Sequence, residues 1–341
     1  MTGSSPKKQC ERITIGTHDG TFHCDEVLAC WMLKQLPKYK RAEILRSRDA
    51  TKLSHCDIVV DVGGVYDPQA NRFDHHQRSF SGTMKSLGSL DFNTKLSSAG
   101  LVYLHLGKEV LSEVTEIPLD DPSMPRLYEK VYEKFIEEID AIDNGIDQYD
   151  GSPRYQITTT LSSRVGGLNP PWNVKDPDVQ GAFEKAMEVC GAELLDRITY
   201  YKESWWPARK LVEEAIADRF ELDPSGEIIM FHSSGCPWKE HLFDIEIEKN
   251  LKPQIKFVLY QDQHHHYRVQ CVPKKLGSFE NRLSLLEQWR GLREEALSSK
   301  SGIPGCIFVH ANGFIGGNRT FEGALKMAKT SLEKGAVKDE K

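Results

Sequence analysis

The chain of 341 residues lacks features that mark several classes of protein. No uncharged apolar run comes close to the roughly 20 residues that cross a bilayer, so no membrane span is predicted. Residues 1–11 lack the apolar segment of a secretory signal, and with Lys7, Lys8 and Arg12 the N-terminus is too short and too poor in arginine for a mitochondrial presequence. We therefore expect a protein that stays inside the cell, with no clear address to one compartment.

Paired cysteines and an excess of positive charge are also missing. The eight cysteines include no Cys-x-x-Cys pair, so neither a disulfide framework nor a structural zinc site is indicated, and reduced thiols are expected. The net charge of −6 argues against a protein that coats nucleic acid non-specifically, because such binding needs many Lys and Arg contacts to phosphate. A local basic groove stays open, although segments 41–48 and 274–293 favour an ordinary solvated surface.

The composition that is present is that of a globular protein with two domains. Hydrophobic residues make up 39% of the chain and charged residues 28%. Alternating strand-like and helix-like runs up to about residue 150 predict an open parallel sheet, whose sites lie at the carboxyl ends of its strands. We predict an α/β fold with a parallel-sheet catalytic domain over 1–170, a helical linker over 171–220 and a smaller mixed α/β domain over 221–341.

Hydrophobic periodicity and turn residues predict the individual elements. A serine at 97 or 98 is expected to cap the helix that follows it. The remaining expected elements are strands over 13–17, 57–62, 228–231, 255–260, 267–272 and 306–310, a turn followed by a short strand over 65–73, helices over 25–36, 122–143 and 321–332, a helical region over 283–297 and two helices over 179–220 interrupted near 205–207.

One loop between the first strand and the first helix is dense in metal-ligating side chains. His18, Asp19, His23 and Asp25 fall within eight residues. Further candidates follow downstream, with a carboxylate after a buried strand, a cluster after a third strand, and a carboxylate at a helix end: Asp61, Asp74, His75, His76 and Asp143. Each motif alone is weak evidence for a metal site. Burying carboxylates at the ends of separate apolar strands, however, costs free energy unless their charges are paired. Their joint occurrence therefore favours a metal site over coincidence.

The mixture of ligands indicates which metal to expect. Imidazoles and aspartates without thiolates suit Mn²⁺ or Mg²⁺ better than structural zinc, and manganese fits the mixture best. In two-metal hydrolases the ions lie about 3.5–4 Å apart, a carboxylate commonly bridges them, and a shared hydroxide attacks phosphorus in line. Asp61 is the expected bridge, with His18 and His23 on one metal and Asp25, His75 and Asp143 chiefly on the other.

Two other conspicuous motifs are better explained without chemistry. The run 264–266 of three histidines lies between two strand-like segments, where an exposed hairpin turn is expected. Trp205 and Trp206 could stack on bases, but aromatic residues at a helix break are more often part of the core. Cys24 lies between His23 and Asp25 and is expected to face away from the metals as inert packing.

With these residues in place, the chain resembles the DHH phosphoesterase superfamily and, more closely, the Myg (melanocyte proliferating gene) family of 3′-to-5′ RNA exonucleases. The resemblance covers nearly the whole chain and is carried by three motifs. They are Gly16 to Glu26 (GTHDGTFHCDE), Phe73 to Gln77 (FDHHQ), and the Gly-Gly-Asn-Arg run at 316–319. The sequence departs from the wider superfamily at His23, where many relatives place an aspartate with one residue fewer after His18. The metal preference is left open by this difference.

The resemblance implies roles for specific residues. The metal ligands would be His18, His23, Asp25, Asp61, His75 and Asp143. Asp61, His76 and Asp74 would be the catalytic set, in which His76 contacts the scissile phosphate or its leaving oxygen and Asp74 orients a histidine ring. The second domain would be the DHH-associated module that holds substrate, with a phosphate-gripping loop and a nearby histidine formed by Gly316, Gly317, Asn318, Arg319 and His310.

Two classes of function follow as hypotheses. The first is a two-metal enzyme, with Mn²⁺ or Mg²⁺, that releases nucleoside monophosphates from the 3′ ends of single-stranded RNA. A close enzymatic alternative is hydrolysis of small phosphate compounds, such as short oligonucleotides, cyclic dinucleotides or pyrophosphate. The second class is a non-catalytic metal- or nucleotide-binding scaffold. The resemblance implies the nucleus and the mitochondrion, the cytoplasm stays open, and so does the oligomeric state, a homodimer included.

Overall fold

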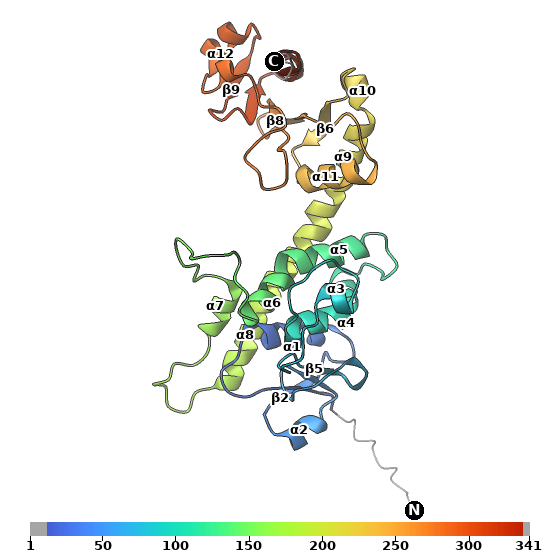
Figure 1. The fold of residues 1–341 in the computed structure, drawn as a ribbon, viewed down its shortest axis with the longest axis vertical. Helices are drawn as coiled ribbons and strands as arrows, with labels where there is room; N and C mark the ends of the chain where they lie inside the picture. Colours follow the sequence, from blue (N-terminus) through green and yellow to red (C-terminus); the bar gives the residue numbers. More distant parts are fainter. Residues whose placement is uncertain (1–11, 337–341) are drawn as a thin grey trace, which may run out of the picture. The chain divides into compact units, whose positions relative to one another are not determined.

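A computed structural model describes residues 12–336, and the chain divides into two compact units, 1–202 and 203–341 (Figure 1). Residues 1–11, considered above for a targeting signal, lie outside the described residues. The segment 171–220, predicted as a linker, spans the boundary, with α8 (Val179–Tyr200) in the first unit and α9 (Trp206–Ala217) in the second. Within residues 12–336, no helix combines the length and the apolar character that crossing a membrane requires.

A five-stranded sheet in the order β2-β1-β3-β5-β4 organises the first unit. Four strands run parallel, and β4 is antiparallel to β5 at one edge. This sheet confirms the predicted α/β class and the mostly parallel arrangement. Its strands are β1 (Thr14–Thr17), β2 (Glu43–Arg46), β3 (Ile58–Val60), β4 (Tyr66–Asp67) and β5 (Arg72–Phe73).

Helix α1 (Cys24–Gln35) lies at the centre of this unit and contacts both α4 (Ser98–Thr115) and α8. Nine of its twelve residues are buried, as expected for a helix that is apolar on most sides. Across the sheet, Val59 packs with Leu53 and Cys56, while its neighbours Ile58 and Val60 are fully buried on the other face. Both faces of the sheet are therefore covered.

The predicted helices of the first unit are present, and the short helices α2 (Ala50–Ser54), α3 (Met84–Leu87) and α7 (Leu161–Gly166) were not predicted. The predicted helix over 122–143 is continuous, but its middle is a π-helical turn, η2 (Tyr132–Ile136). The other elements are η1 (Pro68–Ala70), α5 (Met124–Val131) and α6 (Glu137–Asp143).

The sheet topology decides where the candidate ligands meet. β3 is hydrogen-bonded to β1 on one side and to β5 on the other. His18 follows β1, Asp61 follows β3 and Asp74 follows β5 directly. Because these three strands are parallel, their carboxyl ends lie at one edge, so three loops that are distant in sequence converge there.

The second unit contains its own five-stranded sheet, in the order β6-β7-β8-β10-β9. β6 and β7 are parallel and the other pairs are antiparallel. Successive residues alternate between two cores, since Ile228, Phe257 and Leu259 belong to one and Ile229 and Val258 to the other. The strands are β6 (Ile228–Ser234), β7 (Phe257–Gln261), β8 (Tyr267–Cys271), β9 (Cys306–Val309) and β10 (Ile315–Asn318).

Helices cover both faces of this sheet. The core that contains Ile229 and Val258 includes residues of α9 and α11, and the other core includes residues of α12 and α13. The buried Trp205 confirms the prediction that this residue belongs to a core, and the histidines at 264–266 form the expected turn between β7 and β8. The helices not yet given are α10 (Arg219–Leu222), α11 (Trp238–Glu248), α12 (Glu294–Ser301) and α13 (Phe321–Ala336).

Two predictions for the second unit are wrong at the level of secondary structure. The helical region expected over 283–297 is mostly irregular and contains only a short 3₁₀ turn, η4 (Glu287–Trp289), and the start of α12. Leu285 and Trp289 are fully buried there. Their apolar spacing therefore comes from two side chains that anchor a loop to the core, and it does not mark one face of a helix. The expected loop at 316–319 is largely strand β10, because its glycines pair with β8 and β9.

A buried ion pair ties three segments of the second unit together. Arg282 forms two parallel hydrogen bonds to Glu246, of 2.7 and 2.6 Å, and also donates to the Ile255 carbonyl at 2.9 Å. The two side chains are only 9% and 6% exposed. Removing one partner would leave a buried charge without compensation.

We predict that Arg282→Met destabilises the second unit by about 3–5 kcal/mol. The matched control is Lys274→Met, which breaks the exposed ion pair with Glu280 and should cost less than about 1 kcal/mol. Hydrogen exchange of the β7 amides reports the local free energy of opening in the full chain. Equal protection in the two variants would contradict this account.

Candidate metal centre

The backbone at the end of β3 makes a sharp turn that places Asp61 at the edge of the sheet. Asp61 has a left-handed backbone with φ of 60°, a conformation that aspartate and asparagine tolerate better than most residues. Gly63 and Gly64 follow with φ of 100° and 68°. The Asp61 carboxylate is 4% exposed and lies between the imidazoles of His18 and His75.

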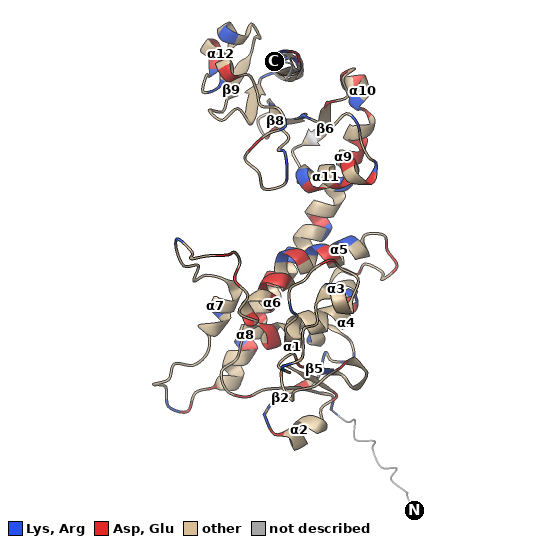
Figure 2. Cartoon of the chain, in the orientation of Figure 1, with Lys and Arg blue, Asp and Glu red and all other residues tan. Residues whose placement is uncertain are grey.

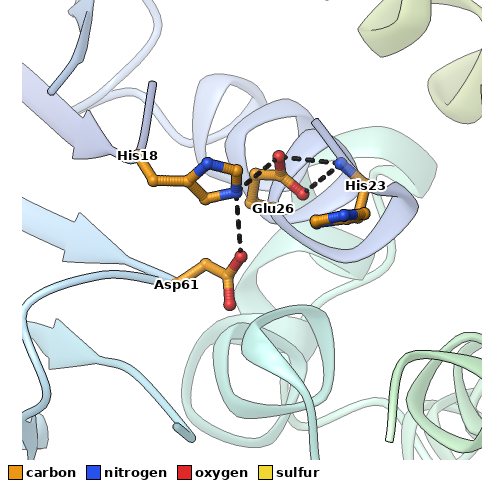
Figure 3. Close-up of side chains that lie close together, drawn as sticks. All are labelled: His18, His23, Glu26 and Asp61. Carbon is orange, nitrogen blue, oxygen red and sulfur yellow. Dashed lines mark hydrogen bonds and ion pairs between the residues drawn. The ribbon is translucent and has the colours of Figure 1, made fainter. Parts of the chain in front are cut away.

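The first group of candidate ligands combines His18, His23, Glu26 and Asp61. His18 Nε2 lies 3.0 Å from Glu26 Oε1 and 3.3 Å from Asp61 Oδ2 (Figure 3). The Glu26 carboxylate also accepts hydrogen bonds from the His23 amide at 2.9 and 3.0 Å, which holds it against the first turn of α1. One ligand atom from each of the four residues lies within 4.8 Å of the others.

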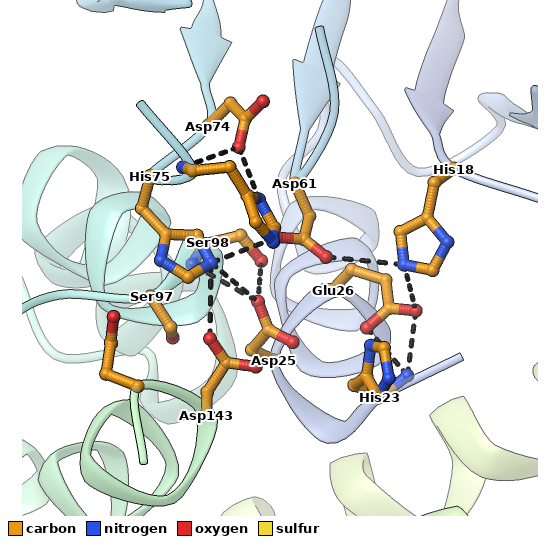
Figure 4. A network of polar contacts seen from close by, with 12 residues as sticks. His18, His23, Asp25, Glu26, Asp61, Asp74, His75, Ser97, Ser98 and Asp143 are labelled. Atoms are coloured by element: carbon orange, nitrogen blue, oxygen red, sulfur yellow. Dashed lines mark hydrogen bonds and ion pairs between the residues drawn. The ribbon is translucent and has the colours of Figure 1, made fainter. Parts of the chain in front are cut away.

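The second group is centred on His75 Nε2. Asp61 Oδ1 and Asp143 Oδ2 each lie 3.2 Å from this nitrogen, and Asp25 Oδ2 lies 3.9 Å from it (Figure 4). Asp25 comes from the first turn of α1, and Asp143 is the last residue of α6, where the sequence placed it. Asp25, His75 and Asp143 form one compact set, and Asp61, His75 and His76 form another.

His76 differs from the other histidines because its side chain is 62% exposed. Its Nδ1 lies 2.8 Å from Asp74 Oδ1. This hydrogen bond raises the pKa of His76 and outweighs burial, which acts in the opposite direction. Asp74 is buried, and its second oxygen accepts from the Gly64 amide at 2.5 Å. Asp74 therefore holds the His76 ring in one orientation through this hydrogen bond.

A cleft of about 620 Å³ opens onto these residues. Six predicted site residues line it, and α7, the end of α6 and the residue after α6 contribute further lining through Ser162, Ser163, Gly166, Ile142 and Asn144. The predicted residues among the lining are His23, Asp25, Asp61, His75, His76 and Asp143. The first unit thus brings together all the predicted metal ligands beside a cleft that is large enough for a small molecule.

Crowding of buried carboxylates dominates the electrostatics of the site. Burial, and then Asp61, raise the pKa of Asp25, and burial and Asp25 raise the pKa of Asp143 to about 9. Burial also raises the pKa of Glu26 to about 8. Asp61 is the opposite case, since burial opposes its charge but the hydrogen bonds from His18 and His75 outweigh burial and lower its pKa. Without a cation, protons hold this cluster together.

The histidines carry those protons. Burial opposes the charged form of His18, but its hydrogen bonds to Asp61 and Glu26 outweigh burial and raise its pKa to about 10. Burial also opposes the charged form of His75. The hydrogen bond to Asp61 and the negative charge of Asp25 outweigh burial and raise the pKa of His75 to about 9. A cation held by these residues would have to displace these protons.

The residues present fit a divalent cation. Asp25 Oδ1 is buried and has no hydrogen-bond partner among residues 12–336. The donor set is made of imidazole and carboxylate, which suits Mn²⁺ and related ions. Asp61 and His75 each belong to two of the three ligand groups, and the bridging role of Asp61 stays a prediction.

Glu26 is the site residue that the sequence argument missed. It is fully buried and lies three positions after His23, at the third residue of α1. An acidic residue at that position normally signals a capping box, and this one does accept from the His23 amide. Its contact with His18 depends on the loop after β1, which no local pattern reveals.

The predicted substrate-binding residues lie in the second unit. Gly316, Gly317 and the buried Asn318 belong to β10, and the Asn318 side chain bonds the Pro304 carbonyl and the Thr320 amide. Arg319 is 61% exposed and pairs with Glu294 at 2.9 Å. His310 is exposed, directly after β9. Their contact with substrate stays a prediction.

Comparison with known proteins decides the family. The family model MYG1_exonuc, described as Uncharacterised protein family (UPF0160), matches residues 14–332. The chain belongs to the MYG1 family. It is 58% identical over 320 residues to the protein named MYG1 exonuclease from Bos taurus, which covers 93% of this chain and 84% of that protein. The proteins of the same name from Homo sapiens and Mus musculus are each 57% identical over 320 residues, covering 93% of this chain and 85% and 84% of theirs.

The match to the MYG1 family extends over both units and includes all the candidate site residues. It begins at the first residue of β1, four residues before His18, and ends within α13, beyond Arg319. The two sheets and the ligand groups are therefore features of the region that defines the family.

We predict that the affinity for Mn²⁺ rises with pH. A ligand must lose its proton to bind a cation, and the pKa values of about 8 to 10 given above for Glu26, Asp143, His75 and His18 keep these groups protonated near neutrality in the metal-free protein. Release of at least one proton corresponds to at least about a tenfold increase in the association constant per pH unit. Calorimetric titration in two buffers with different ionisation enthalpies counts the protons. An affinity that is constant between about pH 6.5 and pH 8 would contradict the prediction.

Proposed function

We propose that this MYG1 family chain is a metal-dependent exonuclease of the DHH phosphoesterase type that shortens single-stranded RNA from its 3′ end and releases nucleoside monophosphates. The observation that carries the proposal is the shared carboxylate Asp61, which belongs to two ligand groups at the base of one cleft. Relatives that are 57–58% identical over 93% of the chain bear the name MYG1 exonuclease, which supports nuclease activity.

The ligand groups supply the electrostatic part of the proposed reaction. Two divalent cations, when bound, neutralise charge on the phosphoryl group and lower the pKa of a nucleophilic water. His18, His23, Glu26 and Asp61 would hold one cation, and Asp25, His75 and Asp143, together with Asp61, would hold the other. Mn²⁺ is the cation that we propose, because the set mixes imidazoles with carboxylates and contains no thiolate.

We assign His76 a role in contacting the substrate. Its Nδ1 is bound to Asp74, so Nε2 is the nitrogen left to face the cleft that His76 lines. The hydrogen bond to Asp74 favours the protonated ring. We assign to Nε2–H a hydrogen bond to the scissile phosphate or donation of a proton to the leaving oxygen.

Lys95 gives the cleft a permanent positive charge. Among the described residues that line this cleft, it is the one Lys or Arg. Its backbone carbonyl accepts from Asn144 at 3.0 Å, which fixes the segment next to Asp143. A phosphate that enters the cleft would meet this ammonium group, so we assign Lys95 to substrate binding.

The reaction is tested with a 5′-labelled single-stranded RNA and Mn²⁺. We expect a ladder of progressively shorter labelled products, because removal from the 3′ end keeps the label on the shrinking chain. Asp61→Asn should reduce turnover by at least about 100-fold. Loss of a residue that only orients a metal ligand already lowers activity by about 10- to 100-fold, and loss of a ligand shared by two cations should lower it more. Asparagine also tolerates the left-handed backbone at this position, so the fold should be kept.

Other outcomes of the same experiment have definite meanings. RNA that stays intact with the metal-loaded protein contradicts the proposal. Immediate release of a labelled mononucleotide contradicts the direction of degradation. Turnover restricted to dinucleotides or pyrophosphate would favour hydrolysis of small phosphate compounds instead.

Lys95→Met should raise KM for RNA and leave kcat nearly unchanged, because the ammonium contacts the phosphate in both the bound state and the transition state. A hydrogen bond to a charged group contributes about 1.5–3 kcal/mol, or roughly ten- to hundredfold in KM. Lys85→Met is the matched control, since Lys85 pairs with Asp91 and does not line the cleft. Equal KM values for the two variants would remove Lys95 from the site.

A further inference from the structure

The N-terminus of α4 lies behind the ligand groups and holds two buried carboxylates from other helices. Ser97 is the residue before this helix of 18 residues, and the sequence predicted that a serine would cap it. The position is correct, but the Ser97 side chain makes no capping hydrogen bond to its own helix. Both Ser97 and Ser98 direct their hydroxyl groups to carboxylates instead.

Ser98 fixes one oxygen of the predicted metal ligand Asp25. Its hydroxyl donates to Asp25 Oδ2 at 2.7 Å, and its amide lies 3.3 Å from the same oxygen (Figure 4). Both side chains are fully buried. The other oxygen, Asp25 Oδ1, is buried and has no hydrogen-bond partner among the described residues. Asp25 is therefore anchored through one oxygen, and the second is left for a cation.

Ser97 fixes Asp140, which lies one helical turn before Asp143 on α6. Asp140 Oδ1 accepts from the Ser97 amide at 2.9 Å, the Ser97 hydroxyl at 2.7 Å and the Gly100 amide at 3.1 Å, and Oδ2 accepts from the Tyr132 hydroxyl at 3.0 Å. A Cβ atom on Gly100 would lie 2.4 Å from both oxygens, so the approach requires glycine. This network sets the position of the last turn of α6, from which Asp143 projects.

The two carboxylates are held by neutral donors at the positive end of a long helix. Within residues 12–336, neither Asp25 nor Asp140 pairs with a Lys or Arg side chain, although both are fully buried. Amide groups and the macrodipole at a helix N-terminus favour negative charge without introducing a competing cation. A Lys or Arg here would repel the metal that the site is proposed to bind.

We propose that Ser97 and Ser98 are positioning residues that set Asp25 and Asp143 for metal binding from a single helix N-terminus. Ser98 acts directly on Asp25, and Ser97 acts on Asp143 through Asp140. The inference rests on the proposed metal-dependent function, but it concerns metal affinity and can be measured without substrate.

The test is calorimetric titration of the full chain with Mn²⁺. Ser98→Ala and Ser97→Ala should each weaken the affinity about 10- to 100-fold, the range for residues that orient metal ligands. The matched control is Ser112→Ala, which removes a hydroxyl from the same helix where it bonds the Ile117 carbonyl. Ser98→Cys keeps a side chain of similar size with a weak donor and should lose affinity as Ser98→Ala does, so it decides the question if the alanine variant does not fold.

A second measurement separates positioning from a general loss of structure. Excess Mn²⁺ should restore turnover in Ser98→Ala, because the defect is one of affinity, and the melting temperature without metal should match that of Ser112→Ala. Affinities of Ser98→Ala and Ser98→Cys within twofold of the control would overturn the inference for Ser98, and the same result for Ser97→Ala would overturn it for Ser97. Wild-type protein that binds Mn²⁺ but leaves RNA intact would contradict the proposed function alone.

Discussion

Repulsion between buried carboxylates is the constraint on which the site depends. Asp25, Glu26, Asp61 and Asp143 lie within one small region, and the first three are almost fully buried. Burial raises the pKa values of Asp25, Glu26 and Asp143, which means that the folded chain keeps such charges only with protons or cations between them. A fold that brings these groups together at this cost is explained most simply by a cation that occupies their centre.

The candidate ligands come from several strands and one helix, and sheet hydrogen bonding or core packing holds each of these elements in place. Parallel strands β1, β3 and β5 deliver His18, Asp61 and His75 to one edge because their hydrogen bonding fixes the register. The buried helix α1 contributes Asp25 and Glu26 from its first turn. The ligand positions are thus fixed by the sheet and by helix packing, so little conformational entropy remains to be lost when a cation binds.

A second layer of polar residues holds the carboxylates in place with uncharged donors. Asp74 orients His76, and the start of α4 holds Asp25 and Asp140 through amide and hydroxyl groups. Helix α6 is rich in acidic residues (Figure 2). Among the described residues that line the cleft, positive charge comes from Lys95 and from protonated histidine.

The sequence by itself determined the residue types of the candidate ligands, their positions after strands β1, β3 and β5, the ending of a helix at Asp143 and the α/β class. These features follow from local periodicity, because the alternation of apolar residues reports which face of an element is buried. Only the tertiary structure decided that Glu26 joins the first ligand group, that Ser98 bonds an aspartate 73 positions away, and that 315–318 is a strand. Each of these depends on contacts between segments that are distant in the chain. A local pattern shows that a residue will be buried, but the identity of its partner is set by how the elements pack.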